Sequence, residues 1–232
     1  MTARAGLILA LALAGPACYT GSAHTLPANS VAAMARDPQW QLVTDVPFVA
    51  QQTAHDCGPA ALAMVLAHFR VPAAEHPELA GGDVRAGTLR DVARAQGLDS
   101  FVVSGTFPDL FAQVERGRPV VVGLAKPMAL TGGRALAHYE VVIGLNRAKR
   151  LILSLDPAAG LRENSFEGFA REWAPTHQVT IVFLGTLKGS PGPPASGLVG
   201  QSPPATHAII FIPRSAGAAL SRVSRSPPPP RA

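Results

Sequence analysis

Cysteine and charge are both scarce in this chain. Only two of its 232 residues are cysteine, Cys18 and Cys57, and charged residues make up 15%. No Cys-x-x-Cys pair is present, so thiol–disulfide exchange is not expected. If Cys18 is removed or modified with an N-terminal signal, Cys57 is the one thiol that remains, and a structural disulfide is excluded. The hydrophobic share of 47% is nevertheless large enough for a folded core.

Motifs that mark several other enzyme classes are also absent. There is no His-Glu-x-x-His and no pair of histidines with metal-ligand spacing, so no metal site is predicted. There is no Gly-x-Ser-x-Gly, which leaves a serine hydrolase without support. The pairs Gly81-Gly82 and Gly132-Gly133 do not form a P-loop, and no cofactor is predicted.

The net charge of +5 comes from the C-terminal end. Lys188 and the four arginines after it are accompanied by no acid, whereas the preceding part carries 15 basic and 15 acidic residues. A nucleic-acid-binding domain would show a basic face with interleaved aromatic residues on its folded part. No such pattern is visible, so a nucleic-acid partner is not expected.

The N-terminus resembles an export signal. Arg4 precedes the apolar run 5–14, which has ten residues, whereas a membrane-spanning helix needs about 20. A positive residue followed by a short apolar run is typical of a signal peptide, which we place at 1–23. We therefore expect an exported protein.

Two routes for processing this signal remain open. Cys18 stands where a lipoprotein signal has its modified cysteine, which would anchor the protein to a membrane through a lipid. The small residues Gly21-Ser22-Ala23 offer an ordinary cleavage site instead. The first route predicts a membrane-anchored lipoprotein, and the second predicts a periplasmic or secreted protein.

Composition divides the rest of the chain into three parts. Residues 24–45 are predicted to be a polar lead-in, and 46–188 a folded domain of a common size. Residues 189–232 are basic and rich in proline, glycine and serine, which predicts a disordered tail.

Hydrophobic periodicity within 46–188 predicts helices first and strands after them. Apolar residues at helical spacing predict a buried helix over 57–69. Thr88 with Asp91 predicts a capping box for a helix over 89–96, which Gly97 ends. Further helices are predicted over 108–115 and 165–173. Strands are predicted over 120–124, 139–143, 151–155 and 179–184, with a turn at 146–149. A helical layer on a largely antiparallel sheet is an α+β fold.

Cys57 opens the first of these helices. Pro59 suits a first helical turn, and the apolar periodicity begins directly after it. A thiol at a helix N-terminus lies at the positive end of the helix dipole, which favours the nucleophilic thiolate. Gly58 would let a substrate backbone approach closely. A buried structural cysteine is the alternative, which the helix position alone does not exclude.

Partners for that thiol occur later in the chain. His138 lies at the start of one predicted strand, and Asp156 lies at the end of the next. If these strands form a hairpin, both side chains lie at one sheet edge, where a nucleophile, a base and an orienting acid can line up. Gln51, six residues before Cys57, would then donate its amide to the oxyanion together with the Cys57 backbone N–H.

The chain resembles the bacteriocin-processing cysteine peptidases, which have a papain-like fold. The resemblance covers about 46–184 and rests on Gln51, Asp56-Cys57-Gly58-Pro59-Ala60-Ala61, His138-Tyr139, Asp156-Pro157 and Gly160. It implies a cysteine peptidase acting on a peptide or protein substrate. Carried over, Cys57 is the nucleophile, His138 the base, Asp156 the orienting acid and Gln51 the oxyanion donor. That family is often fused to peptide-exporting transporters. This chain shows no transporter domain, so we expect a stand-alone exported member.

Several neighbouring residues are alternatives or bystanders. Gln52 competes with Gln51 for the oxyanion role, and Asp56 is expected to cap the helix. His55 is expected on the surface and His68 is expected to pack rather than act as a ligand. Three acids are expected to be solvated: Asp99, Asp109 and Glu140.

The same motifs leave a second function open. A peptidase-like module that binds a peptide without cutting it would use the same fold. The presence of cysteine, histidine, aspartate and glutamine together favours the enzyme, because a degenerate binder would more often have lost the cysteine or histidine.

Overall fold

The computed structural model describes residues 21–72, 74, 76–80, 83–127 and 135–185. Contacts between residues divide the chain into two compact units, Met1–Ser190 and Pro191–Ala232. Every described residue belongs to the first unit. Most of the predicted signal, including Cys18, and the tail 189–232 lie outside the described residues. Within the described ranges, no helix combines the length and the hydropathy needed to cross a bilayer.

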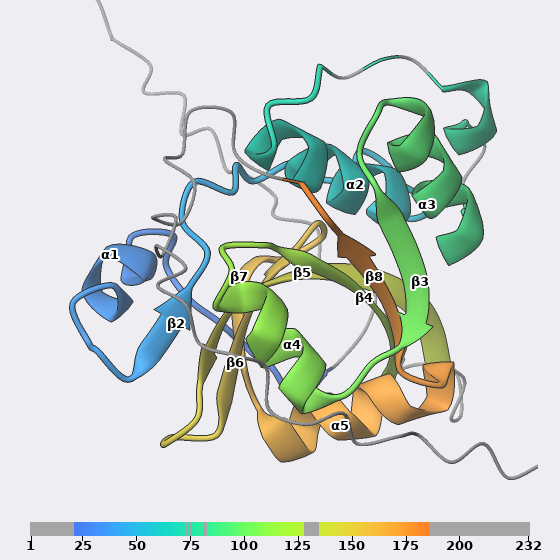
Figure 1. Ribbon diagram of the computed structural model, residues 1–232. Helices are drawn as coiled ribbons and strands as arrows, with labels where there is room; N and C mark the ends of the chain where they lie inside the picture. The colour runs from blue at the N-terminus through green and yellow to red at the C-terminus, as the bar shows by residue number, and fades with distance from the viewer. Residues whose placement is uncertain (1–20, 73, 75, 81–82, 128–134, 186–232) are drawn as a thin grey trace, which may run out of the picture. The chain divides into compact units, whose positions relative to one another are not determined.

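An antiparallel sheet organises the fold (Figure 1). Its strands are His24–Thr25 (β1), Trp40–Leu42 (β2), Ser100–Ser104 (β3), Val120–Pro127 (β4), Ala135–Asn146 (β5), Leu151–Asp156 (β6), Gly160–Ser165 (β7) and Val179–Phe183 (β8). They follow the order β1-β7-β6-β5-β4-β8-β3, and β2 pairs with β5. The predicted hairpin of β5 and β6 is confirmed, with Val141 opposite Leu155.

Helices cover both faces of the sheet. They are Ser30–Met34 (α1), Cys57–His68 (α2), Ala86–Ala95 (α3), Phe107–Val114 (α4) and Phe166–Trp173 (α5), with 3-10 turns at Pro77–Leu79 and Ala174–Thr176. Figure 1 shows α2 and α3 on one side, and α4 and α5 on the other. The predicted α+β class is confirmed.

The helix α2 is held rigidly against the sheet. Leu62, Met64 and Val65 are almost fully buried in a core that also contains Val141 and Ile181. Burial of each such side chain contributes about 1.5–3 kcal/mol. A helix that is apolar nearly all round is a core helix, so its first residue, Cys57, has a fixed position relative to the sheet.

The predicted capping box of the second helix is wrong. Helix α3 begins at Ala86, and Thr88 lies inside it. The carboxylate of Asp91 instead accepts hydrogen bonds from Arg90. The end is as predicted, because Gly97 follows the helix with φ 81°, a conformation that glycine adopts without strain.

A capping box occurs one helix later. Asp109, expected to be solvated, accepts from the backbone N–H of Thr106, and its own N–H donates to Thr106 Oγ1. The reciprocal bonds start α4 at Phe107. Asp109 is still exposed, but it has a structural role.

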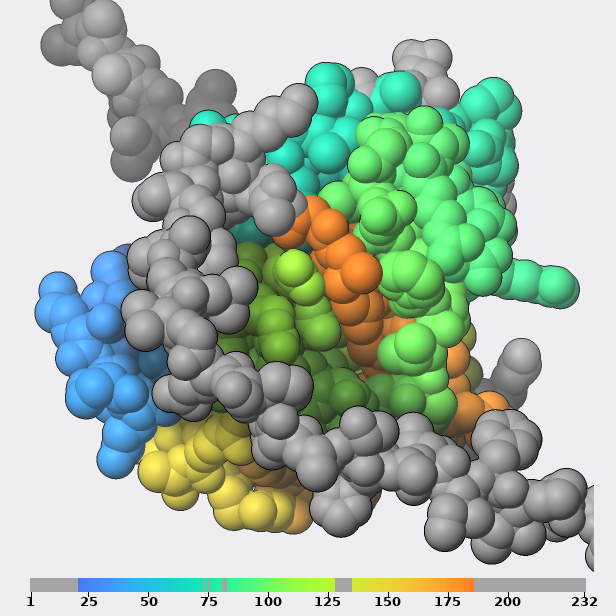
Figure 2. Space-filling model, in the orientation of Figure 1, coloured from blue at the N-terminus to red at the C-terminus, as the bar shows by residue number. Residues whose placement is uncertain are grey.

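Residues 24–45 contribute structure of their own. β1 pairs with β7, and β2 pairs with β5 through Trp40, which lies opposite Asn146. The backbone N–H of Val43 continues this pairing by donating to the carbonyl of Ile143. Figure 2 shows the blue N-terminal residues next to the yellow β6–β7 hairpin. The segment predicted as a lead-in is thus built into the sheet.

Ser22 is also bonded to the domain. Its backbone N–H and its hydroxyl both donate to Glu172 Oε1, at 2.7 and 2.8 Å, and the hydroxyl lies 3.0 Å from Asn164 Oδ1. Arg162 donates to the carbonyl of Ala23 at 2.8 Å. A Cβ at position 168 would lie 2.5 Å from Ser22 Oγ, which is too close. The absence of a side chain at Gly168 therefore leaves the space that Ser22 occupies.

Candidate active site

Cys57 is the first residue of α2 and is 8% exposed. Its backbone N–H is at a helix start, where donors lack intrahelical partners and the helix dipole is positive. The predicted helix start is therefore confirmed, and Pro59 lies in the first turn. This location suits a thiol that must carry negative charge.

Asp56 occupies the N-cap position, but its side chain does not cap the helix. Asp56 Oδ2 accepts the backbone N–H of Thr53 at 3.0 Å instead. The prediction of a capping carboxylate is therefore wrong. The bond closes a tight turn before Cys57 and so fixes how the preceding loop enters the helix.

His138 and Asp156 form a buried pair. His138 Nε2 lies 2.7 Å from Asp156 Oδ1, and the two residues are 3% and 0% exposed. Asp156 is the last residue of β6, as predicted. His138 lies inside β5, which begins at Ala135, rather than at the start of a strand. The hairpin nevertheless brings the two side chains together as predicted. Asp156 Oδ1 also accepts the backbone N–H of Ala158 at 2.9 Å, which fixes the carboxylate.

The charge of His138 is set by its neighbours. Burial alone would lower its pKa, but hydrogen bonds to Asp156 and Cys57 and the charges of Asp156 and Glu140 outweigh burial and raise the pKa to about 9. Asp156 engages Nε2 of the ring. The hydrogen bond between His138 and Cys57 therefore uses the other ring nitrogen, Nδ1. A histidine with this pKa carries a proton on both ring nitrogens at neutral pH.

Gln51 lies in the loop before α2. Its backbone N–H donates to the carbonyl of Pro157, the residue after Asp156, at 3.0 Å. Its side-chain Nε2 donates to the carbonyl of Thr53 at 2.9 Å, which leaves a second amide hydrogen for another acceptor. Gln52 is exposed and donates to Ala50. The loop thus ties Gln51, rather than Gln52, to the strand end that carries Asp156.

Tyr139 packs against the start of α2. Burial and the charge of Cys57 raise the pKa of Tyr139 to about 12, so it stays a neutral phenol. A Cβ at Gly58 would lie 3.3 Å from the Tyr139 ring and 3.4 Å from Leu89. The glycine next to Cys57 therefore lets the helix approach Tyr139 closely, a packing role that the sequence did not indicate.

Glu140 is not solvated, which corrects the prediction. It is 1% exposed, and its carboxylate pairs with Lys126 Nζ at 2.5 Å and accepts from Ser154 Oγ at 2.6 Å. Lys126 also pairs with Glu172 at 2.6 Å and is fully buried. The sequence signal for this cluster is a lysine that follows the apolar run of β4 and an acid two residues after His138.

His138, Glu140 and Asp156 together offer three ligand-type atoms within 4.8 Å of one another. Within the part of the chain that the structure describes, this is a grouping that could hold a metal ion by distance. Asp156 is already engaged by His138, however, and Glu140 by Lys126, whose ammonium supplies the positive charge. Each of these side chains thus already has a partner within the cluster, so the three residues do not fit a metal site.

The other histidines of this region have the roles expected of them. His68 is buried, and its two ring nitrogens contact the carbonyls of Asp45 and Gly117. His55 is exposed and pairs with Asp83 at 3.2 Å. Asp99 is exposed, as predicted.

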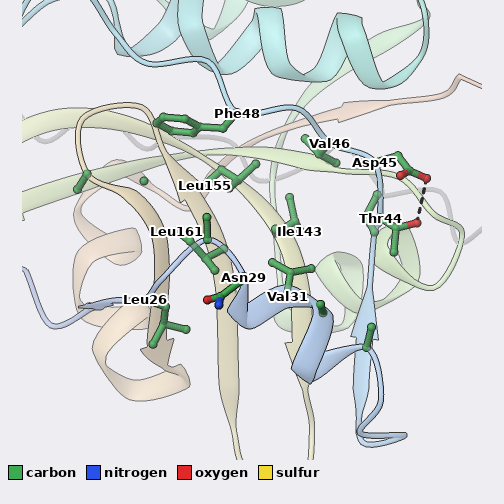
Figure 3. Close-up of a pocket in the computed structure, with 16 residues that line it drawn as sticks. Leu26, Asn29, Val31, Thr44, Asp45, Val46, Phe48, Ile143, Leu155 and Leu161 are labelled. Carbon is green, nitrogen blue, oxygen red and sulfur yellow. Dashed lines mark hydrogen bonds between the residues drawn. The ribbon is translucent and has the colours of Figure 1, made fainter.

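An apolar cavity of about 650 Å³ adjoins the loop after β6 (Figure 3). Residues 156–159, the Asp156 loop, connect β6 to β7. Leu155 and Gly160, on either side of this loop, both line the cavity. Its other walls come from α1, from residues 43–48 and from β5. Its main apolar side chains are Leu26, Val31, Val46, Phe48, Ile143 and Leu161. A cavity with this lining suits apolar groups, and Leu155 in its wall is the residue before Asp156.

The model of the Peptidase_C39 like family matches residues 43–181. The chain belongs to the Peptidase_C39 like family. The matched region contains Cys57, His138, Asp156 and Gln51. Membership confirms the resemblance seen in the sequence and makes this chain a relative of cysteine peptidase domains.

Individual relatives agree with this family. The chain is 28% identical over 144 residues to the mesentericin transport/processing ATP-binding protein MesD of Leuconostoc mesenteroides. This match covers 60% of the chain and 19% of that relative, so the chain spans about a fifth of its length.

The fold resembles that of a solved structure. A protein described as a C39-like peptidase from Bacillus anthracis superposes with a TM-score of 0.50 at 17% identity, over 63% of this chain and 98% of that one. A double glycine motif protease from an AMS/PCAT transporter, solved with its leader peptide, gives a TM-score of 0.46 at 24% identity, over 61% and 93%.

Proposed function

We propose that this protein is a cysteine peptidase that hydrolyses peptide bonds, with Cys57 as nucleophile, His138 as acid and base, and Asp156 as orienting acid. The observation that carries the proposal is the buried His138–Asp156 pair, hydrogen-bonded to a thiol at a helix start. Membership in the peptidase family supports the same chemistry.

The first half of the reaction forms a thioester. The Cys57 thiolate attacks the scissile carbonyl carbon, a C–S bond forms, and the carbonyl oxygen takes up the negative charge. The backbone N–H of Cys57 and the free amide hydrogen of Gln51 stabilise this oxyanion. When the intermediate collapses, the C–N bond breaks and the imidazolium of His138 gives its proton to the leaving amine.

The second half restores the enzyme. His138, now neutral, removes a proton from a water molecule that attacks the thioester carbonyl. The C–S bond breaks, the carboxylic acid product leaves, and the thiolate–imidazolium pair is regenerated. Asp156 holds the ring in one orientation and stabilises its charged form throughout.

A peptide with apolar side chains is the proposed substrate. The apolar cavity beside the Asp156 loop has room for several such side chains, and residues 43–48 connect it along the chain to Gln51 and Cys57. The relative MesD is described as a transport and processing protein, which supports a peptide substrate here.

Alkylation of Cys57 tests the catalytic pair. In a Cys18→Ser background, iodoacetamide at about pH 6 should label Cys57 at least about 10-fold faster than a free thiol, which is protonated there. His138→Ala should remove the excess rate. His55→Ala is the matched control, since it removes a nearby exposed histidine, and should keep it. Slow labelling that does not depend on His138 contradicts the proposal.

Peptide cleavage separates an enzyme from a binding module. The protein is incubated with a mixture of peptides that carry apolar side chains, and products are identified by mass spectrometry. New termini should appear with the parent protein and not with Cys57→Ser. If both proteins bind the same peptides and neither cuts any, the non-cleaving module is the better description.

We also propose that the protein is exported and that its signal is removed upstream of Gly21, with Cys18 as the lipid-modified first residue of the mature chain. The contacts of Ser22 with Glu172 and Asn164 support this choice. A cut after Ala23 would remove Ser22 and leave Glu172 without those donors, at a cost of about 1–3 kcal/mol.

The mature N-terminus tests this proposal. Expression in a bacterial host, followed by intact-mass measurement and membrane fractionation, should give a lipid-bearing chain that begins at Cys18, and Cys18→Ser should abolish membrane association. A chain that begins at His24 contradicts the proposal. An unprocessed chain in the cytoplasm contradicts export itself.

A further inference from the structure

A second acid lies beside the candidate catalytic pair. His138 and Glu140 are alternate residues of β5, so their side chains leave the same side of the strand. Asp156 reaches the same place from the end of β6. One nitrogen or oxygen from each of the three side chains lies within 4.8 Å of the others, and all three residues are buried.

Glu140 is held in place from two further strands. Lys126 of β4 pairs with one carboxylate oxygen, and Ser154 of β6 donates to the other. Glu172 of α5 holds Lys126 from another direction, and Ser22 donates to Glu172. The carboxylate of Glu140 therefore has a fixed position relative to His138.

Stability does not explain this arrangement well. Removing charges from water costs several kcal/mol per ion, and apolar replacements of buried ion pairs are often neutral or stabilising. Apolar residues such as Leu124 and Val142 occupy neighbouring buried positions of the same strands. The proximity of Glu140 to His138 indicates a role in the site.

We propose that Glu140 is a positioning residue for His138, and that its carboxylate, fixed by Lys126 and Ser154, keeps the imidazole in its charged form beside Cys57. This inference rests on the proposed function, in which that imidazolium is the acid. Glu140 touches no reacting atom and acts through His138. Lys126 neutralises part of the charge, so the effect of Glu140 is smaller than that of Asp156.

The charged groups around His138 define the sign of the effect. Asp156 and Glu140 are negative, Cys57 becomes negative in the ion pair, and Tyr139 stays neutral. Lys126 is positive and is bonded to Glu140 and Glu172. Both acids beside the ring favour the imidazolium, so removing the Glu140 charge makes His138 lose its proton at a lower pH.

The experiment compares Glu140→Gln with the parent protein in the Cys18→Ser background. The rate of Cys57 alkylation is measured against pH, and the ring nitrogens of His138 are titrated by NMR, with His138→Gln used to assign their signals. Glu140→Gln should move the His138 titration, and the alkaline limit of the ion pair, to lower pH by about one unit.

Glu172→Gln is the matched control. It removes a carboxylate that pairs with the same lysine at nearly the same distance, yet Glu172 is not among the groups that gather around His138. A purely structural role of the ion pairs predicts equal effects from both variants. Positioning of His138 predicts a shift in Glu140→Gln and little or none in Glu172→Gln.

The remaining outcomes are also decisive. Glu140→Asp keeps the negative charge, but its side chain is one methylene shorter, so the carboxylate lies farther from His138. It should move the His138 titration in the same direction by a smaller amount. This variant also serves as the test if Glu140→Gln does not fold. Unchanged titration in the variant that folds, or equal shifts in Glu140→Gln and Glu172→Gln, overturns the inference. The NMR titration reads His138 directly, so it decides about Glu140 even if no peptide is ever cleaved.

Discussion

His138 Nε2 and Asp156 Oδ1 lie 2.7 Å apart, in a pair of side chains that are almost completely buried. Burial removes competing water, and the adjacent hairpin strands β5 and β6 fix both residues. A histidine held this way has one ring nitrogen bonded to the acid, and its charge depends on few neighbours. Its behaviour can therefore be predicted from those neighbours.

Asp156→Asn should slow the alkylation of Cys57 at about pH 7 by at least about 10-fold. The variant removes the carboxylate whose hydrogen bond and charge raise the pKa of His138, and one pH unit corresponds to a factor of ten in protonation. Asp83→Asn is the control, because it disrupts the exposed His55–Asp83 pair instead. Labelling of Asp156→Asn at the parent rate would show that the pair does not control the thiol.

Stability should fall as the pH rises from about 6.5 towards 9. The pKa of His138 is raised in the folded protein, from 6.5 to about 9, so its stabilising contribution is complete below the unfolded value and is lost as the pH rises through the folded one. The difference corresponds to up to about 3 kcal/mol. Urea unfolding is measured across this range with Cys57 in place, because its hydrogen bond is one of the causes of the raised pKa. His138→Gln should flatten the dependence, and an equally steep loss in that variant counts against the prediction.

Ser22→Ala should lower the free energy of unfolding by about 1 kcal/mol. The variant removes the hydroxyl that donates to the buried Glu172 and lies beside the buried Asn164, while the backbone N–H bond to Glu172 remains. Ser104→Ala, which removes an exposed hydroxyl bonded to the carbonyl of His177, is the control and should change stability by less than about 0.5 kcal/mol. Equal effects of the two variants in chemical denaturation would mean that Ser22 is not anchored in solution.

Val31→Glu should raise KM about 10-fold for a cleaved apolar peptide, with kcat little changed. The variant puts a charge into the wall of the apolar cavity but leaves Cys57 and His138 untouched. Ala33→Glu adds the same charge to the same helix at an exposed position outside the lining, and should leave KM unchanged. If Val31→Glu cleaves with the parent KM, the cavity does not bind the substrate.

The sequence predicted most of the elements that carry the candidate site. Local patterns were enough for α2, α4, α5 and the β5–β6 hairpin, because the relevant signals are short: helical periodicity after Cys57, β-branched runs, and a turn after Asn146. The sequence correctly placed Cys57 at a helix start and Asp156 at a strand end. It placed His138 at the start of its strand, whereas β5 begins three residues earlier, at Ala135. Helix caps were less predictable, as Asp56 and Asp91 show, since a carboxylate can bind any of several nearby donors.

Tertiary structure alone decided which polar groups are buried together. Glu140 was expected to be solvated, and its position two residues after His138 does not reveal that Lys126 pairs with it or that Glu172 pairs with Lys126. Ser22 belongs by its local sequence to a cleavage site, but Glu172 and Asn164 bind it. The physical reason is the same in both cases. Periodicity and propensity act over a few residues, whereas the desolvation of a charge depends on which distant strands and helices pack around it.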